Sequence, residues 1–159
     1  MFDLVEGAKI IQGVRPTTMG AADTGDYISM ENAHTVWAII SVDSATTEIT
    51  MTPKLASAYA GTGSSAITGG AKFWVNTNTS QLDRLTATTH TTAYTLSDNA
   101  NGAMVVCRYD PAAAASSNTH FTIDVSTATA ANAGRYSVVY VLEPRYGGYR
   151  ATIATTSST

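Results

Sequence analysis

Alternating apolar residues recur in short runs along this chain, and that two-residue period constrains its fold more than any other feature. The run "HTVWAIISVD", residues 34–43, places Val36, Ala38, Ile40 and Val42 on one face of an extended strand. Runs of the same kind are "DYISM", "EITMTP", "AKFWVNTN", "RLTATTHTTAYTL", "AMVVCRYD", "HFTIDVS" and "RYSVVYVLE". Turn residues separate them at roughly 8 to 12 residues, a spacing typical of sandwiches and barrels. The chain is therefore predicted to be all-β, a single sandwich or jelly-roll-like domain of about seven to nine strands.

The strand pattern also predicts which side chains share a face. In the 34–43 run, Trp37 and Ile39 point away from the apolar face, so both faces of this strand are expected to be partly covered. Trp37 and Trp74 both fall mid-strand and are expected in the core. Further residues expected to face inward are Phe73, Val75, Phe121, Ile123 and Val125.

Turn and helix signals divide the runs. The Thr-Pro pair at 52–53 provides an N-cap followed by proline, which predicts a short helix over "PKLASAYA" ending at Gly61. The Asp-Pro pair at 110–111 predicts one further helical turn. The Asn-Gly pair at 101–102 is a hairpin signal. The "EITMTP" strand is expected to pair with the strand before it.

The two ends of the chain have weak periodicity and suggest arms around a central domain. Residues 1–25 are predicted to be an extended N-terminal arm; folding back onto their own domain is the alternative. Residues 26–146 are predicted to form the sandwich, and residues 147–159 a tail that is either disordered or ordered only by a neighbour. Tyrosine and arginine are enriched at interface hot spots, so those near the ends are the candidate contacts; the alternative is a loop covering the sandwich end. These residues are Arg15, Arg145, Tyr146, Tyr149 and Arg150.

The low charge of the chain points to protein–protein contact. Charged residues make up 13% of the sequence, against roughly 25% in ordinary globular proteins. Short neutral side chains lose little rotamer entropy on burial, which suits a surface covered by other subunits. A lightly charged extracellular β-domain is the alternative. The net charge of −3 includes no basic block, and the longest apolar run is "VWAII", so neither nucleic acid nor a membrane is an expected partner.

Residues that could carry chemistry are scattered. The three histidines lack metal-ligand spacing, and no pair of acidic residues stands out as an acid/base dyad. The stretch "GTGSSA" at 61–66 matches a dinucleotide fingerprint, but a buried strand before it and a helix after it are not predicted. Cys107 lies in an alternating run and is expected to be a buried small hydrophobe. The chain is expected to be no enzyme, with no catalytic residue, metal or cofactor.

The order of several segments resembles a group of small virion proteins of tailed bacteriophages. The segments are "DYISMENAHTVWAIISVD", "TMTPKLASAYAGTG", "KFWVNTN" and "VVYVLEPRY", which together run from about Asp26 to Tyr146. Cys107 and Arg108 depart from the group, in which an acidic residue commonly follows that strand. The resemblance implies a capsid decoration (cement) protein on the virion surface, synthesised in the host cytoplasm. Its implied partners are the major capsid protein and itself, as a homo-oligomer with a trimer favoured.

Two other roles stay open. The chain could be a head–tail connector or tail component, which would be present in few copies per particle. It could also be a glycan-binding module on the virion, which would need exposed tryptophan or tyrosine on a sheet face.

Overall fold

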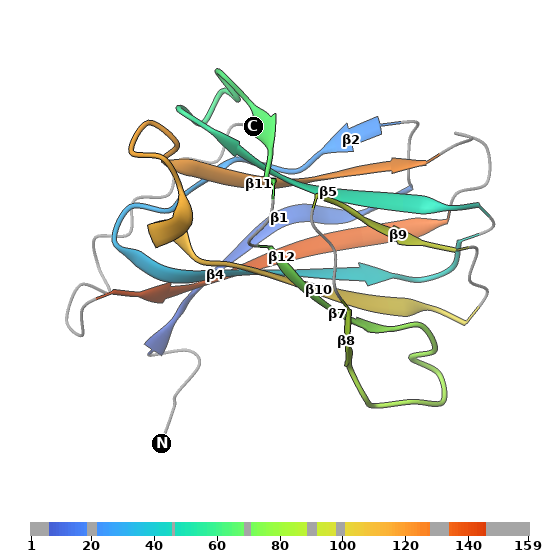
Figure 1. Ribbon diagram of the computed structural model, residues 1–159. Helices are drawn as coiled ribbons and strands as arrows, with labels where there is room; N and C mark the ends of the chain where they lie inside the picture. The colour runs from blue at the N-terminus through green and yellow to red at the C-terminus, as the bar shows by residue number, and fades with distance from the viewer. Residues whose placement is uncertain are drawn as a thin grey trace.

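Two antiparallel β-sheets pack face to face in the computed structural model, and the apolar core lies between them (Figure 1). The structure describes residues 7–18, 22–45, 47–68, 71–88, 92–97, 101–127 and 134–145. The predicted all-β sandwich is confirmed. Five of the strands in these ranges are only two or three residues long, so the described strands outnumber the predicted ones.

Sheet A is the lower layer in Figure 1 and sheet B the upper layer. In spatial order, sheet A consists of β1 (Lys9–Thr18), β12 (Arg135–Pro144), β4 (Ala33–Val42), β10 (Ala103–Tyr109), β7 (Lys72–Asn76) and β8 (Thr86–Thr88). Sheet B consists of β2 (Ala22–Thr24), β11 (His120–Thr127), β5 (Ile49–Ala56) and β6 (Ser65–Ala66), with β3 (Ile28–Ser29) on β11 and β9 (Tyr94–Leu96) on β5.

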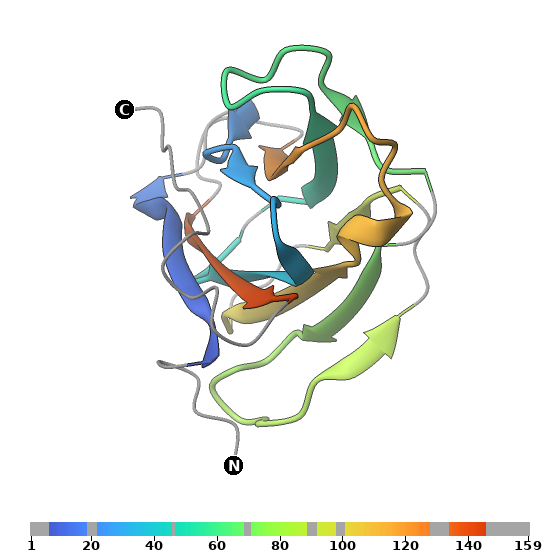
Figure 2. The same ribbon diagram turned by 90° about the vertical axis from the view of Figure 1, so that its left-hand side faces the viewer.

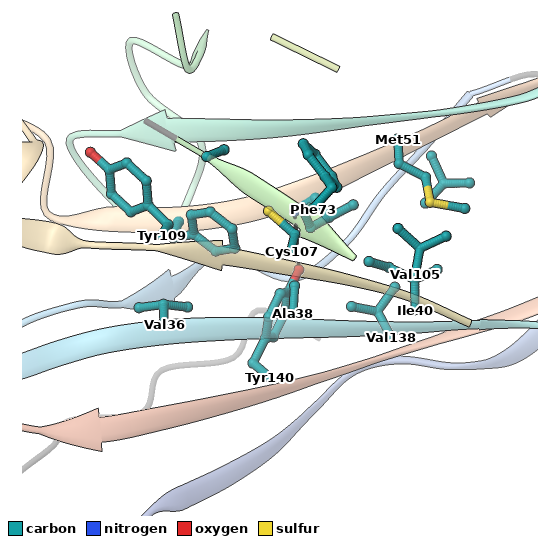
Figure 3. Close-up of a cluster of buried hydrophobic side chains, with 14 of the residues drawn as sticks. Val36, Ala38, Ile40, Met51, Phe73, Val105, Cys107, Tyr109, Val138 and Tyr140 are labelled. Carbon is teal, nitrogen blue, oxygen red and sulfur yellow. Dashed lines mark hydrogen bonds between the residues drawn. The ribbon is translucent and has the colours of Figure 1, made fainter. Parts of the chain in front are cut away.

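The core is built from the inward faces that the alternation predicts. Val36, Ala38, Ile40 and Val42 of β4 are all buried, and the residues predicted to face inward on the later strands are buried too. Figure 3 shows the β4 side chains meeting those of β10 and β12 beneath sheet B. Cys107 lies in this cluster, fully buried, and burial raises the pKa of its thiol. Its prediction as a small core hydrophobe is confirmed.

The hydroxyl of Tyr140 links the two sheets. Tyr140 lies on β12 of sheet A, and its oxygen accepts a hydrogen bond of 3.1 Å from the backbone N–H of Ile123 in sheet B. This N–H lies between the ends of β2 and β3, where β11 has no strand partner on that side. Thr122 beside it donates to the carbonyl of Gly25 at 2.7 Å. Burial raises the pKa of Tyr140 to about 12.

The helix predicted over "PKLASAYA" is wrong, because β5 continues through Pro53 to Ala56. Proline is tolerated here because of its position in the ladder. The carbonyl of Pro53 accepts from Ile67 N–H at 3.0 Å, on the side facing away from β11. Since the N–H and C=O of a strand residue point to the same side, the missing N–H of Pro53 removes no bond to β11.

Two predicted pairings are also wrong. The "EITMTP" strand, β5, lies in sheet B and pairs with β11, β6 and β9, so the chain crosses between sheets after β4. The Asn101-Gly102 turn connects β9 in sheet B to β10 in sheet A, so it is a crossing and not a hairpin. Gly102 still has the left-handed φ of +73° that such a turn requires. A turn can be recognised locally, but the sheet that receives the next strand depends on distant residues.

Two remaining predictions concern residues 1–25 and the Asp-Pro signal. Within the first, Lys9–Thr18 pairs along β12, and Ala22–Thr24 pairs with β11. For these residues the structure has the alternative arrangement, folded onto their own domain, and Ile11 and Val14 pack against the core. The predicted turn is confirmed as a single 3₁₀ turn at Pro111–Ala113, capped by Asp110 Oδ1 accepting from Ala112 N–H at 2.9 Å.

Candidate interaction surface

Of the contact residues predicted from the sequence, the structure describes Arg15 and Arg145, and these two lie far apart. Arg15 lies exposed on β1, between the positions that pair with Val138 and Tyr136 of β12. Arg145 is also exposed but follows the opposite end of β12, about 23 Å away along the extended strand. Near Arg15, burial raises the pKa of the Asp26 carboxyl while the guanidinium acts in the opposite direction. Tyr146, Tyr149 and Arg150 lie outside the described residues.

Arg145 borders a hollow of about 480 Å³ at the end of the sandwich that Figure 2 views directly. Its backbone N–H donates to the carbonyl of Asn32 at 2.7 Å. Glu31 and His120 also line this hollow, and burial lowers the pKa of His120. Thr119 beside the hollow is already engaged, because its Oγ1 donates to the carbonyl of Ser57 at 3.2 Å and lies 2.9 Å from His120 Nδ1.

A larger feature is the outward face of sheet A, which carries apolar and aromatic residues across all six strands. The register places them in two adjacent rows, and we call these rows the tryptophan face. The first row is Ile10, Val141, Trp37, Arg108 and Lys72. The second row is Gln12, Val139, Ile39, Val106, Trp74 and Ala87.

Trp37 and Trp74 lie side by side on this face. Their ring centroids are 5.8 Å apart with the planes tilted by 39°. The guanidinium carbon of Arg108 lies 5.4 Å from the Trp37 ring centroid, close enough for a cation–π contact. Both indoles are half-buried, so the prediction that they belong to the core is wrong. A mid-strand position does not reveal the face, and alternation with Ala38 and Phe73 points the two indoles outward.

The outward face of sheet B has a different character. Lys54 and Asp124 form an ion pair there, and the hydroxyls of Thr50 and Thr95 lie 3.2 Å apart. Thr52 lies between Thr50 and Lys54 on the same face. One outer surface of the sandwich is therefore hydroxyl-rich and charged, whereas the other is predominantly apolar.

Apolar exposure continues at the edges of the tryptophan face. Ile10 on β1 is 49% exposed, and Leu82 and Leu85 between β7 and β8 are 55% and 39% exposed. Asn76 holds this β7–β8 connection in place, because its side chain donates to the Leu82 carbonyl and accepts from Asn78 N–H. The exposed leucines thus lie on an anchored loop beside the sheet.

Reasoning from the sequence missed this face, although a signal for it was present. Runs of consecutive apolar residues such as "VWAII", "MVV" and "VVYV" cannot direct all their side chains to one side of a strand. In a two-layer sandwich the second side of each strand faces outward. Unbroken apolar runs in such a fold therefore indicate an apolar outer face.

The described residues offer little to other kinds of chemistry. Within them, no three His, Cys, Asp or Glu side chains gather where a metal ion could bind. No helix in the same ranges is long and apolar enough to cross a membrane. The "GTGSSA" stretch follows strand β5 and runs into the short strand β6 at Ser65–Ala66, so no helix N-terminus stands there to receive a pyrophosphate.

No protein-family model matches this chain, and no curated protein matches it. A solved structure with a related arrangement is the crystal structure of SPBc2 prophage-derived protein YomS. The two chains share 12% sequence identity at a TM-score of 0.48, over 85% of this chain and 91% of that one.

Proposed function

We propose that this chain is a non-enzymatic structural protein of a tailed-phage virion, which decorates the outer capsid surface and bridges neighbouring subunits. The observation that carries the proposal is the difference between the two outer faces of the sandwich. Sheet A presents the tryptophan face, and sheet B presents threonines with the Lys54–Asp124 pair. A protein built into an assembly needs such a division, with one side against another protein chain and the other side in water.

Composition and resemblance support the same role. Tryptophan and arginine are the residue types most enriched at interface hot spots, and Trp37, Trp74 and Arg108 lie together on this face. The charged fraction of 13% keeps the desolvation cost of a broad contact low. The segment order shared with small virion proteins suggests the major capsid protein as partner. The residues that remain proposed secondary contacts are Arg15, Arg145, Tyr146, Tyr149 and Arg150.

The proposal is tested by locating and counting the chain in purified virions. Quantitative mass spectrometry should find it in copy numbers comparable to the major capsid protein, and cryo-electron microscopy should place it outside the head. A few copies per particle, with density at the neck or tail, would instead support the connector or tail role.

A glycan-binding role is a second candidate, favoured by one observation. Trp37 and Trp74 are only partly buried and lie side by side on a sheet face, and a sugar-stacking site needs accessible aromatic rings of this kind. Titration of the purified protein with oligosaccharides, followed by tryptophan fluorescence, tests it. A saturable change that Trp74→Ala abolishes would support glycan binding, and an unchanged spectrum across a broad glycan panel would remove it.

A further inference from the structure

We infer that the tryptophan face is the surface on which two copies of this chain pack together, about a two-fold axis parallel to β4. The pairing rests on the proposed role as an assembly protein and specifies how the protein meets itself. Isologous two-fold contacts are the commonest form of self-association, because a single patch serves both copies.

The face can serve as the apolar centre of a dimer interface. Its eleven positions, each taking about 4.8 Å by 6.8 Å of sheet, cover about 360 Å². A stable protein interface takes about 800 Å² from each partner, usually as an apolar centre with a more polar rim. Leu82 and Leu85, in the connection between β7 and β8, add exposed apolar area at one edge of the face. A patch of this size exceeds what a single sugar ring would cover.

The centre of the face favours a protein partner over a glycan. Ile39 of β4 is flanked by Val139 of β12 and Val106 of β10, and none of the three side chains can hydrogen-bond a sugar hydroxyl. An axis along β4 brings Ile39 of one copy against Ile39 of the other. It also brings the two copies of Trp37 together near the middle, where hot-spot residues are most effective.

The charges on the face become complementary under the same symmetry. The axis exchanges the two neighbours of β4, so β10 of one copy faces β12 of the other. Arg108 then lies over Val141 of the second copy. Glu143 of that copy is the next outward residue along β12, about 7 Å from Val141. An arginine side chain can span this distance. Within one chain these two residues are about 12 Å apart across β4. Neither forms an ion pair among the described residues.

The pairing is tested by sedimentation of the purified full chain at a series of concentrations. The wild-type chain should be a dimer. Arg108→Glu and Glu143→Arg should each weaken the dimer by about tenfold or more, since each places like charges against each other. The double variant reverses both charges and should recover the wild-type dissociation constant to within about threefold. Recovery by the double variant is the result that a merely structural role of either residue would not give.

Two further variants control for folding. Thr52→Glu adds a charge to the outward face of sheet B, mid-strand on β5, and should leave the dimer unchanged. Ile39→Lys places a charge at the proposed axis and should give a folded monomer, checked by circular dichroism. If Arg108→Glu does not fold, Glu143→Arg remains informative, because Glu143 is half-buried at the end of β12.

Several results would overturn the pairing. They are a wild-type monomer at all concentrations, a trimer, a double variant no better than the singles, or a monomeric chain that binds an oligosaccharide through Trp74. The proposed function fails separately. A dimer that is absent from virions would overturn the virion role and leave the pairing intact. A monomer or trimer found on capsids would overturn the pairing and leave the virion role intact.

Discussion

At the scale of single residues, the hydroxyl of Tyr140 has the most definite role in holding the sandwich together. It is the partner of the Ile123 N–H, which no neighbouring strand reaches. Its ring packs edge-on against Phe121, with centroids 6.0 Å apart. Gly13 leaves room for this ring, because a Cβ at that position would lie 2.2 Å from Tyr140 Cε2.

Replacing Tyr140 by Phe tests the hydroxyl alone. The Tyr140→Phe variant should lose about 1–3 kcal/mol in free energy of unfolding, because the buried Ile123 N–H is left without an acceptor. Urea unfolding followed by fluorescence measures it. Tyr27→Phe is the matched control: its hydroxyl bonds Ser64 Oγ at 2.6 Å in an exposed position, so removal should cost about 0.5 kcal/mol or less. Equal losses in the two variants would contradict the role of Tyr140.

The raised pKa of Tyr140 predicts a loss of stability in alkali. Its pKa is about 12 in the folded state and about 10 when unfolded, so the native state holds this proton more tightly. The stabilisation is complete below about pH 10 and is lost as pH rises toward 12, with a slope near 1.4 kcal/mol per pH unit. Cys107, whose pKa is also raised, contributes in the same direction.

Unfolding free energies measured from pH 8 to 12 check this prediction. Because Tyr140→Phe keeps the Cys107 thiol, the difference between the wild-type and variant curves isolates the phenol. Parallel curves across the whole range would show that Tyr140 titrates normally.

At the scale of elements, the sequence predicts the faces of strands better than their partners. The inward residues of β4, β7 and β11 follow from alternation, which is a local property. The sheet to which a strand belongs cannot be predicted from that strand alone, because β4 pairs with β12 and β10, whose sequences lie far along the chain. Pro53 misled the prediction for the same reason. Its compatibility with β5 depends on a ladder position that only the partner strand defines.

The candidate site was less predictable than the fold. The sequence drew attention to tyrosines and arginines near the ends, and the structure describes only Arg15 and Arg145 of these, far apart along β12. The tryptophan face depends on the simultaneous register of six strands. In the sequence, only the unbroken apolar runs indicate that this outer face is apolar.

Neighbouring residues of β7 provide a test of face assignment. Phe73→Ala should cost about 3–5 kcal/mol, because Phe73 is 1% exposed and its loss leaves a cavity. Trp74→Ala should cost only about 1–2 kcal/mol, although tryptophan is the larger residue, because its indole is only partly buried and lies on the outer side of the sheet.

Melting and urea curves of the two single variants decide the matter, with the wild-type chain as reference. A larger loss for Trp74 than for Phe73 would contradict the assignment of the outer face. Trp74→Ala should nevertheless weaken self-association in the sedimentation experiment, so stability and assembly separate in this one variant.

At the scale of the whole molecule, the sandwich is dominated by pairings between distant parts of the chain. β1 pairs with β12 from Lys9↔Leu142 to Thr18↔Arg135, and sheet crossings follow β4 and β9. Folds of this kind close long loops before their contacts form, so they fold slowly.

Refolding from urea should accordingly take milliseconds to seconds, the range typical of all-β sandwiches. Stopped-flow fluorescence of Trp37 and Trp74 measures it, and Ile39→Lys controls for association because it should fold as a monomer. Complete refolding within microseconds would contradict the long-range topology.

The place of β12 also has a consequence for biosynthesis. β12 lies between β1 and β4, yet it is the last of the described strands to leave the ribosome. At about 5–20 residues per second, β1 waits on the order of 10 s for its only strand partner among the described residues. During that interval one edge of β4 is also open, and open edges are sites of aggregation. A chain truncated before Arg135 should therefore be insoluble, because the edges of β1 and β4 that pair with β12 stay open.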